Sequence, residues 1–473
     1  EKLAEYIEAE PSLRLYSHFF EEILRLAPHT LSSREEEILA LSTEMAAAPG
    51  NIHSALSNAD LKFGTIRDEE GAEAELTAGN FIEFMHSPNR QVRKDAFHAL
   101  YEAYLEHKYS FATLLDSSLR KDLFYSKQRK YSSTFESALY PDNIPQEVYH
   151  NLLAAVHEYL PTMYRYQELR RELLRLDQVH AYDLYAPLFE VKLKISYQQA
   201  QEILLKALAP LGEEYIKVLQ AAFTSGWIDV YENKGKRSGA YAWGAYGTHP
   251  YVLLNYKESL EGLYTLAHEL GHAMHSYLSN SKQPYIYADY TIFLAEIAST
   301  VNEVLLTRYL LRTLEGERLA VLNYYLEQFR TTLFRQAMFA EFELITHSLV
   351  AEAQTLTMES LNEKYQELNG KYYGPEVELD PQLAIEWARI PHFYTAFYVY
   401  KYATGFSSAV ALAKAIEEEG AEGYLEFLAS GSSDYSLNIL KKAGVDLATG
   451  EPFQRALANF ADAVEKLAEV RGR

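Results

Sequence analysis

Cysteine is absent from the 473 residues. The chain therefore has no disulfide framework, no thiol nucleophile and no cysteine-based zinc finger. It also lacks an apolar run approaching the roughly 18 residues of a membrane-spanning helix, so we expect no membrane partner. Basic residues are few: 66 acidic residues against 44 basic ones give a formal net charge of -22. Such a surface argues against nucleic acid or anionic lipid as a partner, because both require a basic face.

Hydrophobic residues are plentiful, at 48% of the chain, and the length allows a large core with two or three sub-domains. Apolar residues recur with helical spacing, interrupted over 1–85 and in longer runs further on. The pattern predicts long helices over 90–121, 145–176, 196–211 and 318–350. A start signal at 32–35, Ser-Ser-Arg-Glu, predicts a further helix there.

Composition changes between residues 226 and 256, where glycines punctuate an aromatic stretch. This pattern predicts short strands joined by turns. The clearest strand is 249–256, and its open edge could take an extended peptide as one more strand. The alternative is an ordinary strand in a small sheet. The residues expected to bind substrate are Gly239, Tyr241, His249 and Tyr251.

Residues 266–275 read Leu-Ala-His-Glu-Leu-Gly-His-Ala-Met-His, with apolar flanks that predict a buried helix. His268 and His272 would lie one turn apart on one face, so both imidazoles could bind one metal ion. Glu269 is rotated by about 100° from His268 and lies beside the pair. A zinc ion with three protein ligands lowers the pKa of its bound water to about 7, and a neighbouring carboxylate can take the proton. Gly271 leaves room for a close neighbour.

The third ligand has three candidates. His275 lies on nearly the same face as the histidine pair, but a continuous helix would carry it past the ion. An extended motif with a third histidine at position 278 fails, because that residue is Leu278. Glu296 lies on the next apolar helical segment, where an acid is costly unless it is paired or bound to a metal. We predict Glu296 as the ligand, with Asp289 or Glu303 as supporting partners of the histidines.

Four stretches together resemble oligoendopeptidase F, within the thimet oligopeptidase family of zinc metallopeptidases. They are His-Glu-Leu-Gly-His-Ala-Met-His at 268–275, Phe-Leu-Ala-Glu-Ile-Ala-Ser-Thr-Val-Asn-Glu at 293–303, Phe-Arg-Gln-Ala-Met-Phe-Ala-Glu-Phe-Glu at 334–343, and Pro-His-Phe-Tyr with Tyr-Val-Tyr at 391–400. The resemblance implies a mainly α fold, a two-lobed helical body around a deep channel with a small β-sheet next to the His-Glu-x-x-His helix. Such a channel would admit short peptides and exclude folded proteins.

The resemblance also implies a division of the chain and a set of roles. Residues 1–85 would form an N-terminal helical region that is truncated relative to oligoendopeptidase F, and 86–473 the zinc metallopeptidase catalytic region. Glu269 would act as general base and later as general acid, and we expect a cytoplasmic enzyme. One zinc ion per chain would be bound by His268, His272 and Glu296.

Two further catalytic groups are implied by the resemblance, His392 and a nearby tyrosine. Histidine and tyrosine are common hydrogen-bond donors to a developing oxyanion. The family's tyrosine matches Tyr400 best, whereas Tyr398 is two positions away and would point in a different direction on a helix. Both tyrosines are therefore kept as catalytic candidates.

We interpret the chain as a zinc-dependent endopeptidase that hydrolyses internal bonds of short peptides by metal-activated water. One alternative is a carboxy-terminal exopeptidase, in which Arg237 or Arg389 would bind the substrate carboxylate. Another is a non-catalytic helical peptide-binding protein with a structural metal, closed by a fourth ligand such as His275 or Asp289. The sequence leaves the cleavage preference and the oligomeric state open.

Overall fold

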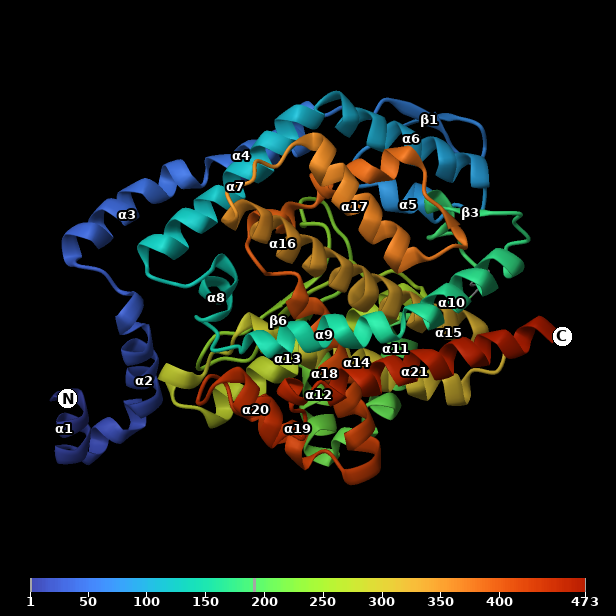
Figure 1. Ribbon diagram of the computed structural model, residues 1–473. Coiled ribbons are helices and arrows are strands. Elements are labelled where there is room, and N and C mark those ends of the chain that lie inside the picture. Colours follow the sequence, from blue (N-terminus) through green and yellow to red (C-terminus); the bar gives the residue numbers. More distant parts are fainter. Residues whose placement is uncertain (1, 190–192, 473) are drawn as a thin grey trace.

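Two groups of helices face each other in the computed structural model, which describes residues 2–189 and 193–472 (Figure 1). The predicted mainly α fold is confirmed. The upper lobe in Figure 1 contains α4 (Ala48–Ala55), α5 (Phe81–Met85), α6 (Arg90–Glu106), α7 (Lys108–Gln128), α16 (Arg335–Ala351) and α17 (Met358–Tyr373). The lower lobe contains α9 (Gln146–Glu158), α10 (Leu160–Leu173), α11 (Tyr197–Ala207), α12 (Glu213–Thr224), α13 (Leu260–Lys282), α14 (Ile292–Thr313), α15 (Arg318–Gln328), α18 (Tyr400–Glu419), α19 (Glu422–Ala429), α20 (Ser436–Lys442) and α21 (Glu451–Ala468).

The N-terminal helices form an arm at one side of the two lobes (Figure 1). They are α1 (Lys2–Ala9), α2 (Ser17–Leu26) and α3 (Ser33–Ala46). The start signal at Ser32 is confirmed, because its side chain and that of Glu35 cap each other's backbone N–H at the first turn of α3. The arm contacts the lower lobe where the Phe19 N–H donates to the Tyr287 hydroxyl at 3.1 Å.

Short helical turns connect the long helices. The 3-10 turns are η1 (Pro11–Tyr16), η2 (Ala27–His29), η4 (Ala181–Asp183), η5 (Ala209–Leu211), η6 (Tyr285–Tyr287), η8 (Pro381–Arg389), η9 (Pro391–Tyr394), η10 (Leu447–Thr449) and η11 (Glu469–Gly472). The π-helical turns are η3 (Leu56–Asp60) and η7 (Phe329–Phe334), and the short helix α8 (Thr134–Leu139) precedes α9.

The long helical patterns of the sequence are confirmed, with breaks that the periodicity did not show. The predicted helix 90–121 is divided into α6 and α7 at His107, and 145–176 into α9 and α10 at Tyr159. The predicted helix 318–350 continues from α15 through the π-helical η7 into α16. Since α15 lies in the lower lobe and α16 in the upper lobe, this continuous run joins the two lobes (Figure 1).

The strands are short and form three small sheets. β1 (Thr65–Arg67) pairs with β2 (Glu73–Glu75), and β3 (Val179–His180) pairs with β7 (Val377–Glu378). The third sheet has the order β4 (Ile228–Asp229), β6 (Tyr251–Leu253), β5 (Tyr241–Trp243). The predicted strand 249–256 is thus β6, and the prediction that it offers an open edge is wrong. Its two sides are occupied by β4 and by β5, which is itself an edge strand.

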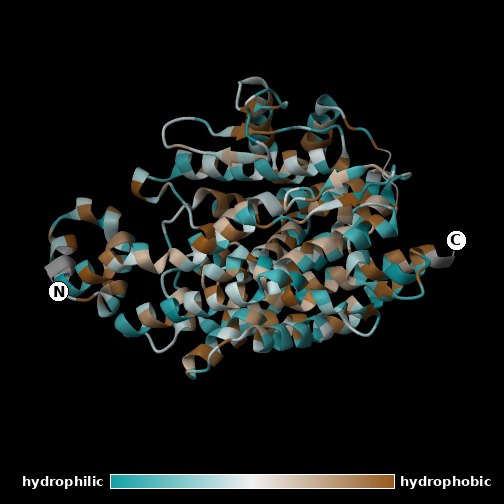
Figure 2. Cartoon of the chain, turned by 90° about the horizontal axis from the view of Figure 1, so that it is seen from above, coloured by the Kyte–Doolittle hydropathy of each residue, from teal (hydrophilic) through white to brown (hydrophobic). Residues whose placement is uncertain are grey.

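The core is built by the apolar stripes of amphipathic helices. On α21, for example, Phe453, Leu457, Phe460 and Val464 recur with helical spacing and are fully buried. Figure 2 shows hydrophobic and hydrophilic residues interspersed along each helix, as this packing requires. Within the described residues, no helix is both long and apolar enough to cross a membrane.

Candidate active site

The His-Glu-x-x-His motif lies in the middle of α13, packed along α14. A Cβ on Gly271 would lie 2.5 Å from the Cα of Ser299 and 2.7 Å from the Ala298 carbonyl oxygen. No side chain fits in that space, so glycine is required for the two backbones to approach. Asn302 of α14 also donates to the Ala267 carbonyl of α13 at 3.1 Å. The expected close approach at Gly271 is therefore confirmed.

Three side chains converge across this contact. His268, His272 and Glu296 each present one ligand atom, and these atoms lie within 4.8 Å of one another. The Glu296 Oε2 is 3.5 Å from His268 Nε2 and 3.7 Å from His272 Nε2, and the two Nε2 atoms are 3.1 Å apart. Two imidazole nitrogens and one carboxylate oxygen are a donor set suited to zinc, and they leave a position for water or substrate. Among the described residues, this is the group whose geometry could hold a metal ion.

A second carboxylate orients the first histidine. Glu303, like Glu296, lies on α14, and its Oε1 is 2.5 Å from His268 Nδ1. The other oxygen of Glu303 accepts from the Gln328 side-chain amide, at the last residue of α15. Burial is the largest single influence and acts to lower the pKa of His268, but the hydrogen bond to Glu303 and the charges of Glu303, Glu296 and Glu269 together raise the pKa to about 9. Of the two supporting partners predicted, Glu303 is the one in contact with a histidine.

Glu269 lies beside the histidine pair with a carboxyl oxygen that has no partner. The residue is only 6% exposed, and its Oε2 is buried without a hydrogen bond. Burial raises the pKa of Glu269 to about 7, with nearby His268 opposing the shift. Its one backbone contact is with the N–H of Ala242 on β5. A carboxyl group with a pKa near neutrality can both accept and return a proton.

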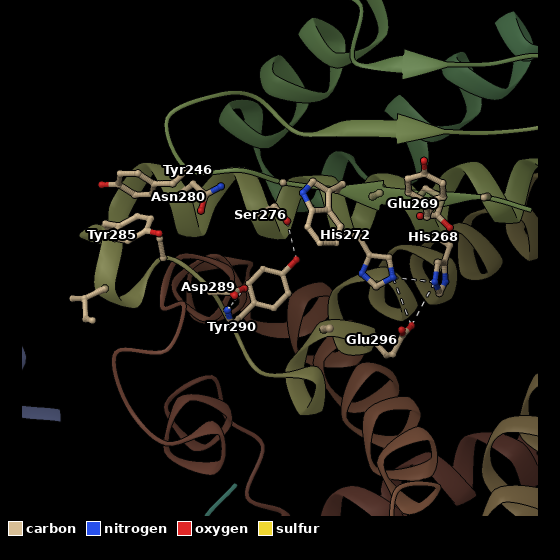
Figure 3. A pocket seen from close by; sticks show the side chains of 18 residues that line it. Tyr246, His268, Glu269, His272, Ser276, Asn280, Tyr285, Asp289, Tyr290 and Glu296 are labelled. Atoms are coloured by element: carbon tan, nitrogen blue, oxygen red, sulfur yellow. Dashed lines mark hydrogen bonds and ion pairs between the residues drawn. The ribbon is translucent and has the colours of Figure 1, made fainter. Parts of the chain in front are cut away.

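The free edge of β5 forms one wall of a cavity of about 750 Å³ (Figure 3). Gly244, at the end of β5, approaches α13 closely: a Cβ there would lie 2.5 Å from the Ser276 Cβ. Figure 3 shows His268, His272 and Glu296 at one end of the cavity. The lining includes Tyr241, Ala242, Trp243, Tyr246, Ser276, Asn280, Tyr285, Ile286, Asp289 and Tyr290.

Two further cavities each share a lining residue with the metal cavity. The metal cavity shares Ala240 with a cavity of about 300 Å³ lined by Gly239, Asn255 and Glu261. It shares Ile286 with a second cavity of about 300 Å³. One neighbouring cavity thus adjoins the groove along β5 at Ala240, and another adjoins it at Ile286.

A cluster of one histidine and two tyrosines lies next to the metal-binding group. The His392 Nε2 is 3.2 Å from the Tyr402 hydroxyl, and the Tyr398 ring stacks on His392 at 5.7 Å. Tyr402 also lines a cavity of about 230 Å³ together with His268 and Glu296. Burial lowers the pKa of His392 and raises the pKa of Tyr402, so both groups are neutral at physiological pH and can donate hydrogen bonds.

Tyr400 does not belong to this cluster, which corrects the prediction from the resemblance. Its side chain is fully buried, and its ring packs 5.1 Å from that of Tyr149. Helix α18 begins at Tyr400, whose side chain points into the core, whereas the rings of Tyr398 and Tyr402 meet edge-on at 5.5 Å. Tyr402 is the residue that the sequence reasoning missed. The sequence feature that could have identified Tyr402 is its position four residues after Tyr398.

The predicted substrate-binding residues are only partly brought together. Tyr241 lines the metal cavity and Gly239 lines the neighbouring one. His249 and Tyr251 line neither, and the His249 ring instead stacks on Trp227 at 5.2 Å. The reason is the strand order, because β5 occupies the side of β6 on which a peptide was expected.

The residues proposed for a closed structural metal site also lie elsewhere. His275 is fully buried, its ring stacks 3.6 Å from that of Tyr290, and both of its nitrogens lack partners. Asp289 is exposed in the cavity and is outside the donor group. Neither residue supplies a fourth ligand to His268, His272 and Glu296.

The helical body, the donor group and the groove place the chain in the class of metallopeptidases whose metal-binding residues come from a His-Glu-x-x-His helix and the helix after it. Comparison with family profiles narrows this class. The profile of peptidase family M3 matches residues 83–459, and the oligopeptidase F profile matches residues 1–63. The chain belongs to peptidase family M3, and it is a metallo-oligopeptidase.

Individual relatives agree with this assignment. Oligopeptidase PepF of Bacillus subtilis strain 168 is 48% identical over 99% of this chain and 71% of its own length. Group B oligopeptidase PepB of Streptococcus agalactiae is 45% identical, over 97% of this chain and 77% of its own. The crystal structure of oligoendopeptidase-F from Enterococcus faecium superposes with a TM-score of 0.83 at 38% identity, covering 100% of this chain and 81% of that one. A putative peptidase from Chlamydophila abortus gives 0.93 at 40% identity, with 99% and 79% covered.

Proposed function

We propose that this metallo-oligopeptidase is a zinc-dependent endopeptidase that hydrolyses internal bonds of short peptides. One observation carries the proposal: His268, His272 and Glu296 converge within 4.8 Å, next to the unpartnered carboxyl oxygen of Glu269. Zinc held by these three residues would supply Lewis acidity to the scissile carbonyl. A cytoplasmic location is part of the same proposal, and cell fractionation with an antibody against the chain tests it.

The residues of the chain have distinct parts in this reaction. A peptide that adds to the free edge of β5 would be held extended across the groove, with its backbone hydrogen-bonded to the strand. Glu269 takes the proton of the attacking water and returns it to the leaving amine, which its pKa of about 7 favours. Tyr402, oriented by His392, donates to the oxygen that becomes negative as the carbonyl is attacked.

The groove supports cleavage of internal bonds. A substrate can extend from the metal cavity toward Ala240 and toward Ile286, because a further cavity adjoins it at each of these residues. The exopeptidase alternative required a cation at the metal cavity, and neither Arg237 nor Arg389 lines it. Arg389 instead donates to the Tyr101 hydroxyl at 3.2 Å and lines a different cavity.

The test uses a quenched-fluorescent peptide blocked at both ends, together with metal analysis of the purified protein. We expect about one zinc per chain and cleavage at an internal bond. Glu269→Gln should keep the zinc and lose about a thousandfold in kcat/KM, as for removal of a general acid–base group. Cleavage confined to peptides with free ends, or full activity of Glu269→Gln, would refute the proposal.

A further inference from the structure

We propose that the end of the groove near Tyr285 is a subsite for a positively charged group of the peptide substrate. The residues that form it are Tyr246, Tyr285 and Asp289, which we call the cation subsite. The proposal rests on the peptidase function above and names the chemistry of its preferred substrates. The positive group is a lysine or arginine side chain or the amino-terminal ammonium of a short peptide.

Aromatic rings form the walls of the cation subsite. Tyr246 is 47% exposed and Tyr285 is 77% exposed, although large aromatic side chains are usually buried. The Tyr285 ring meets that of Tyr246 edge-on at 5.3 Å, and the Tyr246 hydroxyl donates to the Gln283 carbonyl at 3.3 Å. These contacts hold the two rings in place while their faces stay open. The face of such a ring attracts ammonium and guanidinium groups within about 6 Å.

Asp289 supplies a negative charge that pairs with no cationic side chain in the part of the chain that the structure describes. Its carboxylate accepts the N–H of the adjacent Tyr290 at 2.9 Å, and no ion pair involves Asp289 anywhere in residues 2–189 and 193–472. Figure 3 shows Asp289 between Tyr285 and the metal-binding group. A cation that stacks on the rings would therefore also lie near a free carboxylate.

The charge balance of the cavity favours a cation at this end. Three carboxylates line it, Glu269, Asp289 and Glu296, and its lining contains no lysine or arginine. The two positive charges of a bound zinc ion would offset the two nearest carboxylates, Glu269 and Glu296, so Asp289 is the charge left over. The cavity beyond Ala240, by contrast, is lined by Lys257 as well as Glu261. An electrostatic preference for positive groups is thus confined to the end with Tyr285.

The experiment compares peptides that differ in one charge. Each peptide is blocked at both ends and carries either lysine or acetyl-lysine at one position flanking the cleaved bond, and kcat/KM is measured with product mapping. Acetylation keeps the length of the side chain and removes its charge. We expect about a tenfold preference for lysine at one position, the usual size for a hydrogen bond to a charged group, and a smaller preference at high salt.

Variants assign that preference to named residues. Asp289→Asn should abolish the preference, and Tyr285→Leu should reduce it, while Tyr285→Phe keeps the ring face and should retain it. Glu73→Gln removes an exposed carboxylate on β2 that lines none of the cavities described here, and it should leave the preference intact. A preference that survives in Asp289→Asn would overturn the proposal, and so would equal rates for charged and acetylated peptides both in this series and in the amino-terminal series below.

A second series separates the two sources of the positive charge. Peptides without lysine or arginine are compared with a free and with an acetylated amino terminus; a preference for the free ammonium that depends on Asp289 assigns the subsite to the peptide end. The binding of the same peptides to the Glu269→Gln variant, followed by fluorescence anisotropy, gives an independent reading. If the wild type cleaves no peptide, the proposed function fails, while an Asp289-dependent charge preference in binding would still support the subsite.

Discussion

Two buried glutamates in the two lobes have opposite surroundings. In the upper lobe, Glu386 on η8 is 3% exposed and accepts from the hydroxyls of Tyr101 and Tyr365 at 2.8 and 2.7 Å and from Arg335 at 2.8 Å. In the lower lobe, Glu269 is 6% exposed and has a buried oxygen without a partner. One buried carboxylate thus has hydrogen-bond donors for both of its oxygens, whereas the other has an oxygen without a donor.

The difference appears in the pKa values of the two groups. Burial is the largest single influence and acts to raise the pKa of Glu386, but the charges of Arg335 and Arg389 and the hydrogen bonds from Arg335 and Tyr365 together lower it to about 2. For Glu269, burial dominates and the pKa rises to about 7. A buried carboxylate with all its hydrogen bonds holds the structure together, whereas one that lacks them is available for proton transfer.

Replacing the incomplete glutamate is expected to have the largest effect on activity and little on stability. Glu269→Gln should lower kcat/KM by about a thousandfold. The melting temperature of the metal-free protein should stay the same or rise, because a neutral amide costs less to bury than a carboxylate. Calorimetry beside the peptide assay measures both. A strongly destabilised Glu269→Gln would remove the contrast with Glu386.

Replacing the satisfied glutamate should do the reverse. Glu386→Gln leaves Arg335 buried without its counter-ion, and breaking a buried ion pair in this way costs about 3–5 kcal/mol. We expect the urea midpoint to fall accordingly, while kcat/KM per folded molecule stays near the wild-type value. The exposed pair of Lys364 and Glu367 offers a matched control, since Glu367→Gln should leave the urea midpoint almost unchanged.

Stability at low pH should depend on Glu386. Its pKa is about 2 in the folded protein against an ordinary value of 4.5, so its ionised form stabilises the fold. That contribution is complete above about pH 5 and is lost as the pH falls toward 2. Urea unfolding of the wild type between pH 5 and 3 should therefore show a steeper loss than Glu386→Gln. Parallel curves for the two proteins would contradict the assignment.

Substitutions of the residues that orient His268 should show the smallest effects. Glu303→Gln weakens the orienting hydrogen bond to the histidine and is expected to lower metal affinity by about 10–100-fold. Gln328 contacts Glu303 rather than the histidine, so Gln328→Leu should lower the metal affinity by about tenfold or less. Chelator competition measures both constants. An effect of Gln328→Leu larger than that of Glu303→Gln would contradict the order of contacts from Gln328 to Glu303 to His268.

The sequence predicted most of the elements that position the site. Helical periodicity located α13 and α14, and the spacing of His268 and His272 indicated one face of a helix, so both features are local. Gly271 also gave a correct prediction, because a glycine within an apolar helix points to a close neighbour. The division at residue 85 and the catalytic roles stay predictions.

What the sequence did not show depends on contacts between distant residues. The central place of β6 follows from its pairing with β4, a strand of two residues with no recognisable pattern of its own. The choice between Tyr400 and Tyr402 depends on where α18 begins and on the ring of Tyr149 far earlier in the chain. Such choices are made by tertiary packing rather than by local periodicity.

All three proposed metal donors come from the consecutive helices α13 and α14, which are joined by the short η6 segment. Contacts between neighbours in sequence form early in folding, and a chain emerging from the ribosome folds from its amino-terminal side. All three donor residues are therefore present in the nascent chain once residue 296 has been synthesised, before α16 to α21 are made.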